Sequence, residues 1–380
     1  MKNNNHLVIM AGGVGSRFWP MSTPERPKQF IDVLGTGRTL LQLTVDRFSG
    51  ICPISQVWVV TSKNYKDIVL EQLPGIPEEN VLLEPCMRNT APCIAYVAWK
   101  IAKRFPDANL VISPSDHIVM NVEEFKRVIT KGLEFTAKNP NILTLGMMPS
   151  RPETGYGYIK AVMDEDPVEN IPYSMLPLDG TFNMDLVPNP AESPAEIVKV
   201  EAFKEKPNLQ TAEQYLQEGG YYWNAGIFIW SVATIQRAFR KYQPELATQF
   251  DAIQPALYEA NEQSVIDEKF PECKAISIDY AIMENADNIY VFPADFGWSD
   301  LGTWGSLYGH LEHDENDNAV IGQGVRMVES SDCVVHVAND RKMVLQGLKG
   351  YIVAEHNGVL MVCRLEDEQR IKSFSESLNK

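Results

Sequence analysis

The sequence predicts an α/β fold in which a mixed, mostly parallel sheet is flanked by helices and followed by a small β-rich unit. Strand-like and helix-like segments alternate over the first 120 residues, which is typical of α/β domains. The last 70 residues change to short apolar runs broken by Gly, Asn and Asp. A chain of 380 residues can bury a large core and carry a second unit. We expect one domain over residues 1–308 and a C-terminal β-rich domain over residues 309–380.

The alternating segments can be placed along the chain by their periodicity. Apolar runs predict strands at residues 6–10, 56–61, 80–85 and 109–119, and amphipathic patterns predict helices at 39–48, 64–73 and 89–105. Such alternation implies a parallel sheet, which binds ligands at the carboxyl ends of its strands. The turns after the strands at 6–10, 80–85 and 109–119 should therefore meet at one crevice.

The C-terminal segment has a different pattern. Strand-like runs cover residues 319–329, 333–338, 341–347, 351–356 and 358–364, and a charged helix-like segment covers 366–378. The runs show no clean hexapeptide repeat, so the pattern leaves open whether they form a regular β-helix.

Composition limits the classes of partner. The hydrophobic and charged fractions, 44% and 22%, are ordinary globular values. A net charge of −16 argues against a nucleic-acid backbone as a partner. The N-terminus lacks the apolar core of a signal peptide, and no apolar run approaches the length of a membrane span. The six cysteines form no C-x-x-C pair, so we expect neither structural zinc nor a disulfide framework. We expect a cytoplasmic protein that binds neither nucleic acid nor membrane.

The first strand runs directly into a glycine-rich turn, AGGVGSR (11–17), and a lysine follows at position 28. The missing side chains let backbone N–H groups approach a polyphosphate. Arg17 can grip two phosphate oxygens at once, and Lys28 adds a point charge. A surface turn with solvated basic residues is the alternative. The candidate nucleotide-binding residues of the turn are Ala11, Gly12, Gly13, Gly15 and Ser16.

Two better-known phosphate motifs are excluded. A Walker A loop needs G-x-x-x-x-G-K-[ST], whereas Lys28 follows Pro27. A dinucleotide fingerprint needs a third glycine three residues after the second, and position 18 is Phe. What remains is the pattern G-G-x-G-x-R-x-x-P-x6-P-K.

The turn EPCMRNTAP (84–92) contains two candidate base-binding residues. Guanine presents two adjacent donors, and the carboxylate of Glu84 can accept from both. An ordinary surface acid is the alternative for Glu84. Asn89 can contact the base, cap the following helix, or do both.

Two aspartates are candidate metal ligands. Asp116 ends the buried strand of SPSDH, and Asp300 lies in FGWSDLGTW. Two carboxylates far apart in sequence are typical of Mg²⁺ sites, in which phosphate and water oxygens complete the shell. Each can also be a plain loop residue. His117 is read as a packing or hydrogen-bonding residue, because magnesium prefers oxygen.

The middle of the chain carries candidate sugar-binding residues. Gly157 suggests backbone close to a ligand or a strand kink. Glu205 can accept sugar hydroxyl protons and Lys206 can neutralise a phosphate, although such a pair is often a surface ion pair. Asn224 lies in a buried-looking strand and needs partners, which sugar hydroxyls or a turn would supply. Asp279 can cap a helix or face the same pocket, and both possibilities stay open.

Together these blocks resemble the bacterial mannose-1-phosphate guanylyltransferase family, also called GDP-mannose pyrophosphorylases. The resemblance runs in order over residues 6–308, through GGVGSRFWP…PKQF, EPCMRNTAP, SPSDH, GYGYI, FKEKP, YYWNAGIF, SIDYAIME and WSDLGTW. SPSDH stands where PADH is more usual, and WNAG where WNSG is, and neither change touches a candidate ligand. Many bacterial relatives continue into a phosphomannose isomerase domain, which we expect this chain to lack.

The resemblance implies a GT-A-like fold and Mg²⁺-dependent transfer of GMP from GTP to mannose 1-phosphate, with GDP-mannose and pyrophosphate as products. Arg17 would stabilise the departing pyrophosphate, with Lys28 also on the phosphates, and Lys206 would hold the sugar phosphate. A homodimer is expected. Two alternatives remain open: a guanylyltransferase for another manno-configured sugar 1-phosphate, such as a heptose, and a non-catalytic subunit that binds GDP-mannose and regulates a partner.

Overall fold

The computed structural model describes residues 4–13, 15–162 and 197–378. Its centre is a nine-stranded sheet in the order β3-β2-β1-β4-β9-β6-β10-β8-β7, with β7 also pairing to β9. The strands are β1 (Asn5–Ala11), β2 (Val57–Ser62), β3 (Val81–Glu84), β4 (Asn109–Pro114), β6 (Ile142–Met147), β7 (Tyr158–Ala161), β8 (Val198–Lys204), β9 (Tyr221–Ser231) and β10 (Ile289–Ala294).

The first half of the sheet is parallel, as the α/β alternation predicts. β1 pairs in parallel with β2 and with β4, and β2 pairs in parallel with β3. The second half is mixed, because β9 runs antiparallel between β4 and β6, and β8 and β7 also join antiparallel. Among the described strands, β10 with β6 is the one further parallel pair in this sheet. The mixed α/β class is confirmed, and its parallel part coincides with the alternating segments.

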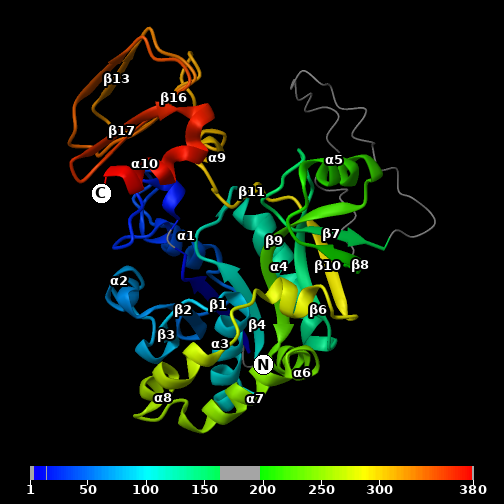
Figure 1. The fold of residues 1–380 in the computed structure, drawn as a ribbon. Helices are drawn as coiled ribbons and strands as arrows, with labels where there is room; N and C mark the ends of the chain where they lie inside the picture. The colour runs from blue at the N-terminus through cyan, green and yellow to red at the C-terminus, as the bar shows by residue number, and fades with distance from the viewer. Residues whose placement is uncertain (1–3, 14, 163–196, 379–380) are drawn as a thin grey trace.

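Helices cover both faces of the sheet (Figure 1). On β1, Leu7 and Ile9 belong to one hydrophobic core and Val8 to the other, because side chains alternate along a strand. The first core includes residues of α1 (Leu40–Arg47), α2 (Lys66–Gln72), α4 (Val122–Lys138) and α5 (Leu209–Glu218). The second includes residues of α3 (Thr90–Arg104), α6 (Val232–Tyr242), α7 (Pro244–Ile253) and α8 (Glu262–Lys269).

The C-terminal β-rich unit is a short coil. Its strands are β12 (Ala319–Ile321), β13 (Val325–Val328), β14 (Val334–His336), β15 (Met343–Gln346), β16 (Tyr351–His356) and β17 (Val359–Arg364). β12, β14 and β16 pair in parallel in one sheet, and β13 and β15 pair in parallel in another. Because the chain alternates between these two sheets, residues 319–356 wind as the coils of a small β-helix. β17 closes the unit antiparallel to β16.

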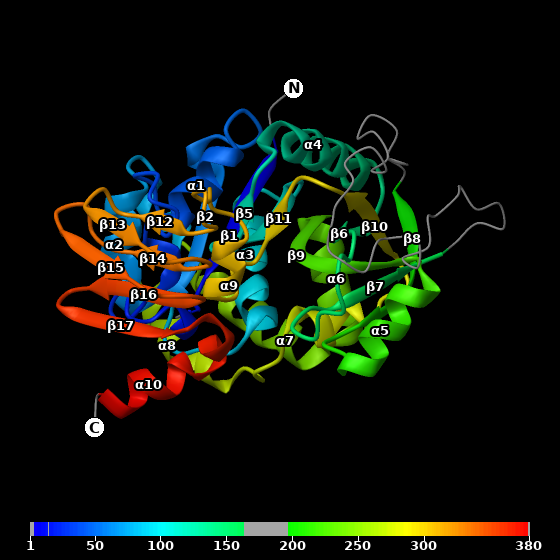
Figure 2. The same cartoon turned by 90° about the horizontal axis from the view of Figure 1, so that it is seen from above.

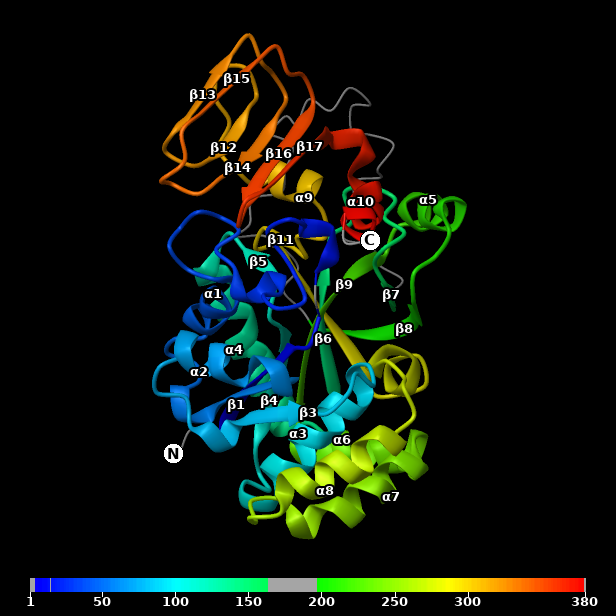
Figure 3. The same ribbon diagram turned by 60° about the vertical axis from the view of Figure 1, so that its left-hand side comes forward.

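The coil lies at the opposite end of the molecule from α7 and α8 in Figures 1 and 3. Seen from above, it lies on the side of β1 and β2 and across from α5, β7 and β8 (Figure 2). The 3-10 helix η12 (Leu365–Arg370) and α10 (Ile371–Leu378) then return toward the large domain, where α10 contacts the 3-10 turn η1 (Ser16–Phe18). The domain boundary after residue 308 stays a prediction.

Two further predictions concern the described part of the chain. All six cysteines are free there, as the absence of C-x-x-C pairs indicates. In the same residues no helix has the length and apolar character needed to cross a membrane.

Candidate active site

The glycine turn and Glu84 lie at the same edge of the sheet. β1 and β3 both run parallel to β2, so their carboxyl ends lie on one side. A Cβ placed on Gly12 would lie 3.7 Å from Oε2 of Glu84, which shows that the two segments are in contact. Two of the strand ends that were predicted to converge are therefore in contact.

Gly15 lets the turn close on Lys28. Its φ of +69° is in the left-handed region, and a Cβ there would lie 2.6 Å from Cβ of Lys28. Gln29 fixes the other side of the turn, because its buried amide donates to the carbonyl oxygens of Ala11 at 3.1 Å and Gly13 at 2.9 Å. Sequence reasoning missed this role. A polar amide directly after the lysine of PKQF was the available signal, since a buried amide requires partners.

Arg17 and Ser16 project from this turn. Both residues are exposed on η1. Within residues 4–13, 15–162 and 197–378, no hydrogen bond or ion pair engages the Arg17 guanidinium. The side chain is therefore available to a ligand, and its role on pyrophosphate stays a prediction.

Lys28 connects the two candidate metal ligands. Its buried ammonium contacts Oδ2 of Asp116 at 2.9 Å and donates to the carbonyl oxygens of Asp300 at 2.9 Å and Leu301 at 3.0 Å. It also lies over the ring of Phe18, 5.5 Å from the centroid. The structure thus brings together a lysine and two acidic loops that are separated by 88 and 272 residues in the sequence (116 − 28 and 300 − 28).

The charges around Asp116 favour its ionised form. Burial by itself would raise the pKa of Asp116, but Lys28 and His117 outweigh burial and hold that pKa below its usual value. Burial lowers the pKa of His117, although Asp116 and Asp300 oppose this effect. Nδ1 of His117 accepts from the indole of Trp298 at 3.2 Å, which agrees with the predicted hydrogen-bonding role.

Asp300 is held by Tyr156. The tyrosine hydroxyl donates to Oδ1 of Asp300 at 2.7 Å, and the backbone N–H of Gly302 donates to the same oxygen at 3.0 Å. Sequence reasoning gave Tyr156 no role of its own. The contact spans 144 residues of sequence, so no local pattern could reveal it.

The two aspartates offer a donor set that fits a hard divalent cation. Both provide carboxylate oxygens, and Lys28 bridges their loops. No group of three or more His, Cys, Asp or Glu side chains suited to a metal exists among the described residues. An ion held here would need further oxygens from phosphate and water, as is usual for Mg²⁺.

Glu84 carries a buried oxygen that lacks a partner. Burial raises the pKa of Glu84 to about 8, and a hydrogen bond with Cys93 partly opposes the effect. Its Oε1 has no hydrogen-bond partner among the described residues. Buried polar atoms are normally satisfied, so this oxygen fits a ligand donor such as those on a base edge. Asn89 caps α3 by accepting from the N–H of Thr90 at 2.8 Å, so its capping role is confirmed.

The candidate sugar residues form a second cluster. A Cβ on Gly157 would lie 2.7 Å from Oε2 of Glu205 and 3.5 Å from Cβ of Asn224, so the missing side chain makes room for both. The side chain of Glu205 is 10% exposed, and Lys206 pairs with it at 3.2 Å while remaining 61% exposed. These two residues therefore do form the ion pair that the sequence left open as an alternative. The lysine is nevertheless exposed enough to contact a ligand.

Asp279 faces this cluster. The amide of Asn224 donates to Oδ1 of Asp279 at 3.1 Å, and its own oxygen accepts from the N–H of Gly226 at 3.0 Å. Burial, followed by the nearby charge of Glu205, raises the pKa of Asp279 to about 6. Asp279 begins a five-residue π-helix, a form that often marks functional sites. Its side chain therefore contacts Asn224 of the sugar cluster, and the N-cap of the helix is Ile278 instead.

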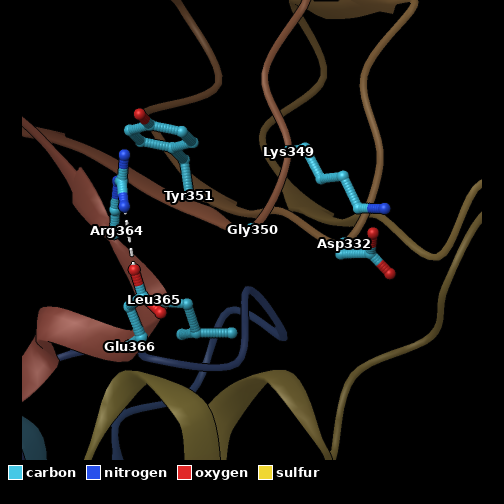
Figure 4. A pocket seen from close by; sticks show the side chains of 7 residues that line it. All are labelled: Asp332, Lys349, Gly350, Tyr351, Arg364, Leu365 and Glu366. Carbon is cyan, nitrogen blue, oxygen red and sulfur yellow. Dashed lines mark hydrogen bonds and ion pairs between the residues drawn. The ribbon is translucent and has the colours of Figure 1, made fainter.

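A separate hollow of about 600 Å³ lies on the C-terminal coil (Figure 4). Its lining mixes two basic and two acidic side chains, and Arg364 pairs with Glu366 at 3.0 Å. The lining residues are Asp332, Lys349, Gly350, Tyr351, Arg364, Leu365 and Glu366. None of the predicted site residues belongs to it.

Comparisons with known proteins agree with this geometry. The model of the family described as nucleotidyl transferase matches residues 6–173 and 180–317. The chain is 31% identical to mannose-1-phosphate guanylyltransferase of Escherichia coli (strain K12), over 98% of this chain and 73% of that protein. It is 32% identical to the alginate biosynthesis protein AlgA of Pseudomonas putida, over 98% of this chain and 71% of that protein.

A solved structure has the same overall fold. It is described as a mannose-1-phosphate geranyltransferase from Thermus thermophilus and superposes with a TM-score of 0.82 at 27% identity, covering 99% of this chain and 100% of that one. This likeness includes the C-terminal coil as well as the sheet. Taken with the glycine turn, the two aspartates and the matched sequence relatives, it places the chain plainly: it belongs to the nucleotidyl transferase family, among the mannose-1-phosphate guanylyltransferases.

Proposed function

We propose that this protein transfers GMP from GTP to α-D-mannose 1-phosphate, forming GDP-mannose and releasing pyrophosphate. A phosphate oxygen of mannose 1-phosphate attacks the α-phosphorus of GTP, and a new P–O bond forms there. The bond between that phosphorus and the oxygen bridging to the β-phosphorus breaks, and the electron pair leaves with pyrophosphate. Atoms and charge balance without any further reactant.

The observation that carries the proposal is the position of Lys28. Its ammonium lies against Asp116 and against the loop of Asp300, directly behind the glycine turn. Phosphoryl and nucleotidyl transfer depend mainly on alignment and on neutralising charge, which is what such an arrangement supplies.

The reaction needs no general base. A phosphate monoester has its second pKa at about 6, so the nucleophile is already ionised at neutral pH. Burial lowers the pKa of His117, so the imidazole stays neutral beside the reacting phosphates. In the proposal, Arg17 stabilises the departing pyrophosphate and Lys28 orders the two acidic loops around the phosphates.

Magnesium is the proposed cofactor, held by Asp116 and Asp300. When bound, it would neutralise phosphate charge and act as a template for the two substrates. Tyr156 and Lys28 orient these two aspartates before substrate arrives. That role belongs to the chain itself, whichever divalent cation is supplied.

In this proposal, Glu84 selects the nucleotide base, and the cluster of candidate sugar residues selects the sugar. The unpartnered oxygen of Glu84 would accept from the guanine edge, which neither adenine nor uracil presents in the same form. Glu205 and Asn224, with Gly157 between them, would hold the mannose hydroxyls, and Lys206 its phosphate. These roles form part of the proposal.

Pyrophosphate release tests the function. Purified protein is mixed with GTP, ATP or UTP and with mannose 1-phosphate or glucose 1-phosphate, with and without magnesium. We expect fast, magnesium-dependent release with GTP and mannose 1-phosphate alone. Release with a manno-configured heptose 1-phosphate instead would identify that sugar phosphate as the substrate. No release from a folded protein that still binds GDP-mannose would favour the regulatory subunit.

Two broader assignments complete the proposal. We place the protein in the cytoplasm, where its nucleotide and sugar-phosphate substrates occur, and cell fractionation tests this placement. The homodimer remains a prediction from the family resemblance. Sedimentation equilibrium at micromolar concentration would detect it.

A further inference from the structure

Glu368, on the C-terminal unit, contacts the loop that carries Asp300. Its Oε2 accepts a hydrogen bond of 2.7 Å from the backbone N–H of Gly305. Gly305 is the second residue of α9 (Trp304–Tyr308), the helix that follows the Asp300 loop directly. A Cβ on Gly305 would lie 3.2 Å from Oε2 of Glu368, so the glycine leaves the space that the carboxylate occupies.

A shared hydrophobic core also joins the large domain to the C-terminal unit. Phe18, Leu301 and Trp304 from the large domain pack in one cluster with Ile352 and Ile371 from the C-terminal unit. The rings of Phe18 and Trp304 lie 5.3 Å apart. Figures 1 and 3 show α9 beside the red C-terminal segment that contains η12 and α10, and α9 contacts η12 directly.

The Asp300 loop needs support from outside. Leu301 has a φ of +46°, which is unfavourable for a residue with a branched side chain. Such conformations persist only where the surrounding structure fixes them. Here the carbonyl oxygens of Asp300 and Leu301 accept from the ammonium of Lys28, so an error in the loop position would displace Lys28 and Asp300 together.

We infer that Glu368 is a positioning residue for catalysis. By holding the first turn of α9, it fixes the Asp300 loop against Lys28, which makes the C-terminal unit part of the catalytic scaffold. This role rests on the proposed function, because Asp300 and Lys28 act in that reaction. Glu368 itself touches no reacting group.

The first experiment compares three variants. Glu368→Ala removes the acceptor, whereas Glu368→Gln keeps an oxygen that can accept from Gly305. Glu366→Ala is the matched control, because Glu366 is two residues away, 72% exposed and paired only with Arg364 among the described ion pairs. We expect kcat of Glu368→Ala to fall about ten- to hundredfold with KM values nearly unchanged, since small misplacements cost rate. Glu368→Gln and Glu366→Ala should keep most of the wild-type kcat.

A second readout needs no activity. Hydrogen–deuterium exchange of the ligand-free protein should show faster exchange of the Gly305 amide, and of the loop at residues 299–302, in Glu368→Ala only. If wild type exchanges slowly there and Glu368→Ala exchanges fast, the contact is established even when no substrate pair releases pyrophosphate. That combination of results would refute the proposed function, whereas the contact between Glu368 and Gly305 would stand.

Two further variants separate positioning from general stability. Val353→Ala weakens the coil's own core, since Val353 packs with Val335 and Val337 rather than in the shared cluster. If Val353→Ala lowers kcat as much as Glu368→Ala at a similar melting temperature, the inference is wrong. Gly305→Ala displaces the Glu368 carboxylate from the other side and should reproduce the fall in kcat if Glu368→Ala fails to fold. Wild-type kcat in a folded variant that lacks the contact would also overturn the inference.

Discussion

The hydroxyl of Tyr156 donates a hydrogen bond of 2.7 Å to Oδ1 of Asp300, and this bond joins the two halves of the candidate site. Tyr156 precedes Gly157 of the sugar cluster, whereas Asp300 belongs to the proposed metal pair. The tyrosine ring packs edge-on against Trp223 and Trp298. If a sugar binds beside Gly157 as proposed, its arrival would therefore affect the orientation of Asp300, the proposed metal ligand.

Tyr156→Phe should lower turnover while leaving the fold intact. A hydrogen bond to a charged group contributes about 1.5–3 kcal/mol, so we expect kcat to fall about tenfold or more and the half-saturating magnesium concentration to rise. Steady-state kinetics across a magnesium titration measure both. Tyr158→Phe is the control, because that hydroxyl accepts from the N–H of Glu153 and does not touch Asp300. Equal losses in the two variants would refute a specific role for Tyr156.

Gly15→Ala should be far more harmful than Gly37→Ala. Both glycines have a positive φ, +69° and +80°, so each alanine carries the left-handed backbone cost of about 1–2 kcal/mol. Only at Gly15 would the new Cβ meet Cβ of Lys28 at 2.6 Å, since a Cβ on Gly37 meets nothing within 4 Å. Denaturant titration should show a larger stability loss for Gly15→Ala, and that variant alone should lose pyrophosphate release. Similar activity in both variants would contradict the close packing of Lys28 under the turn.

Glu84→Gln should change how stability and GTP binding depend on pH. The folded-state pKa of Glu84 is about 8, whereas the ordinary value for a glutamate, which applies to the unfolded chain, is 4.5. Between these values the folded protein holds a proton that the unfolded chain has released, so Glu84 makes the free energy of unfolding fall as pH rises through this window. Chemical denaturation at several pH values should show a flatter profile in Glu84→Gln.

GTP binding supplies the second readout for Glu84. If the carboxylate reads guanine, GTP must displace the proton, and wild-type affinity should rise by up to about tenfold per pH unit below pH 8. The variant should lose this dependence and should discriminate less between GTP and ATP. Ionisation of the nucleotide itself affects both proteins and cancels in the comparison. A wild-type and a variant profile that run parallel would disprove base reading by Glu84.

Asp279→Ala should weaken sugar binding without affecting the nucleotide. The Asn224 amide would lose its acceptor at 3.1 Å and could turn in the pocket. We expect KM for mannose 1-phosphate to rise about tenfold and KM for GTP to stay within about twofold. Asp279→Asn keeps an acceptor oxygen and should restore most of the affinity. Asp287→Ala is the control, because Asp287 is 80% exposed and pairs with Lys241.

Much of the candidate site could be predicted from the sequence because its residues follow strand ends. β1 and β3 both run parallel to β2 and end at one edge of the sheet, so Gly12 and Glu84 were expected to converge, and they do. The insertion of β9 between β4 and β6 could not be predicted. Its register depends on pairings across at least 76 residues (223 − 147), and no local pattern encodes them.

The internal partners of the charged residues could not be predicted from the sequence either. Lys28 was expected on phosphates, and its contacts with Asp116 and two carbonyl groups emerge only from the folded chain. Gln29 and Tyr156 were overlooked because each acts on a group that another motif supplies. The coil was left open because its rungs pair in parallel without a regular hexapeptide repeat.

Among the described residues the guanidinium of Arg17 has no partner, which has a consequence for the proposed turnover cycle. A long side chain exposed on η1 samples many rotamers, and ordering it on pyrophosphate costs up to about 2 kcal/mol of conformational entropy. In the proposed reaction this cost arises when the leaving group develops charge and is returned when the product departs. An arginine already fixed by an acidic neighbour would have no such conformational entropy to lose and regain. In that proposal, the rotamer freedom of Arg17 would favour product escape, and one side chain would both stabilise the leaving group and release it.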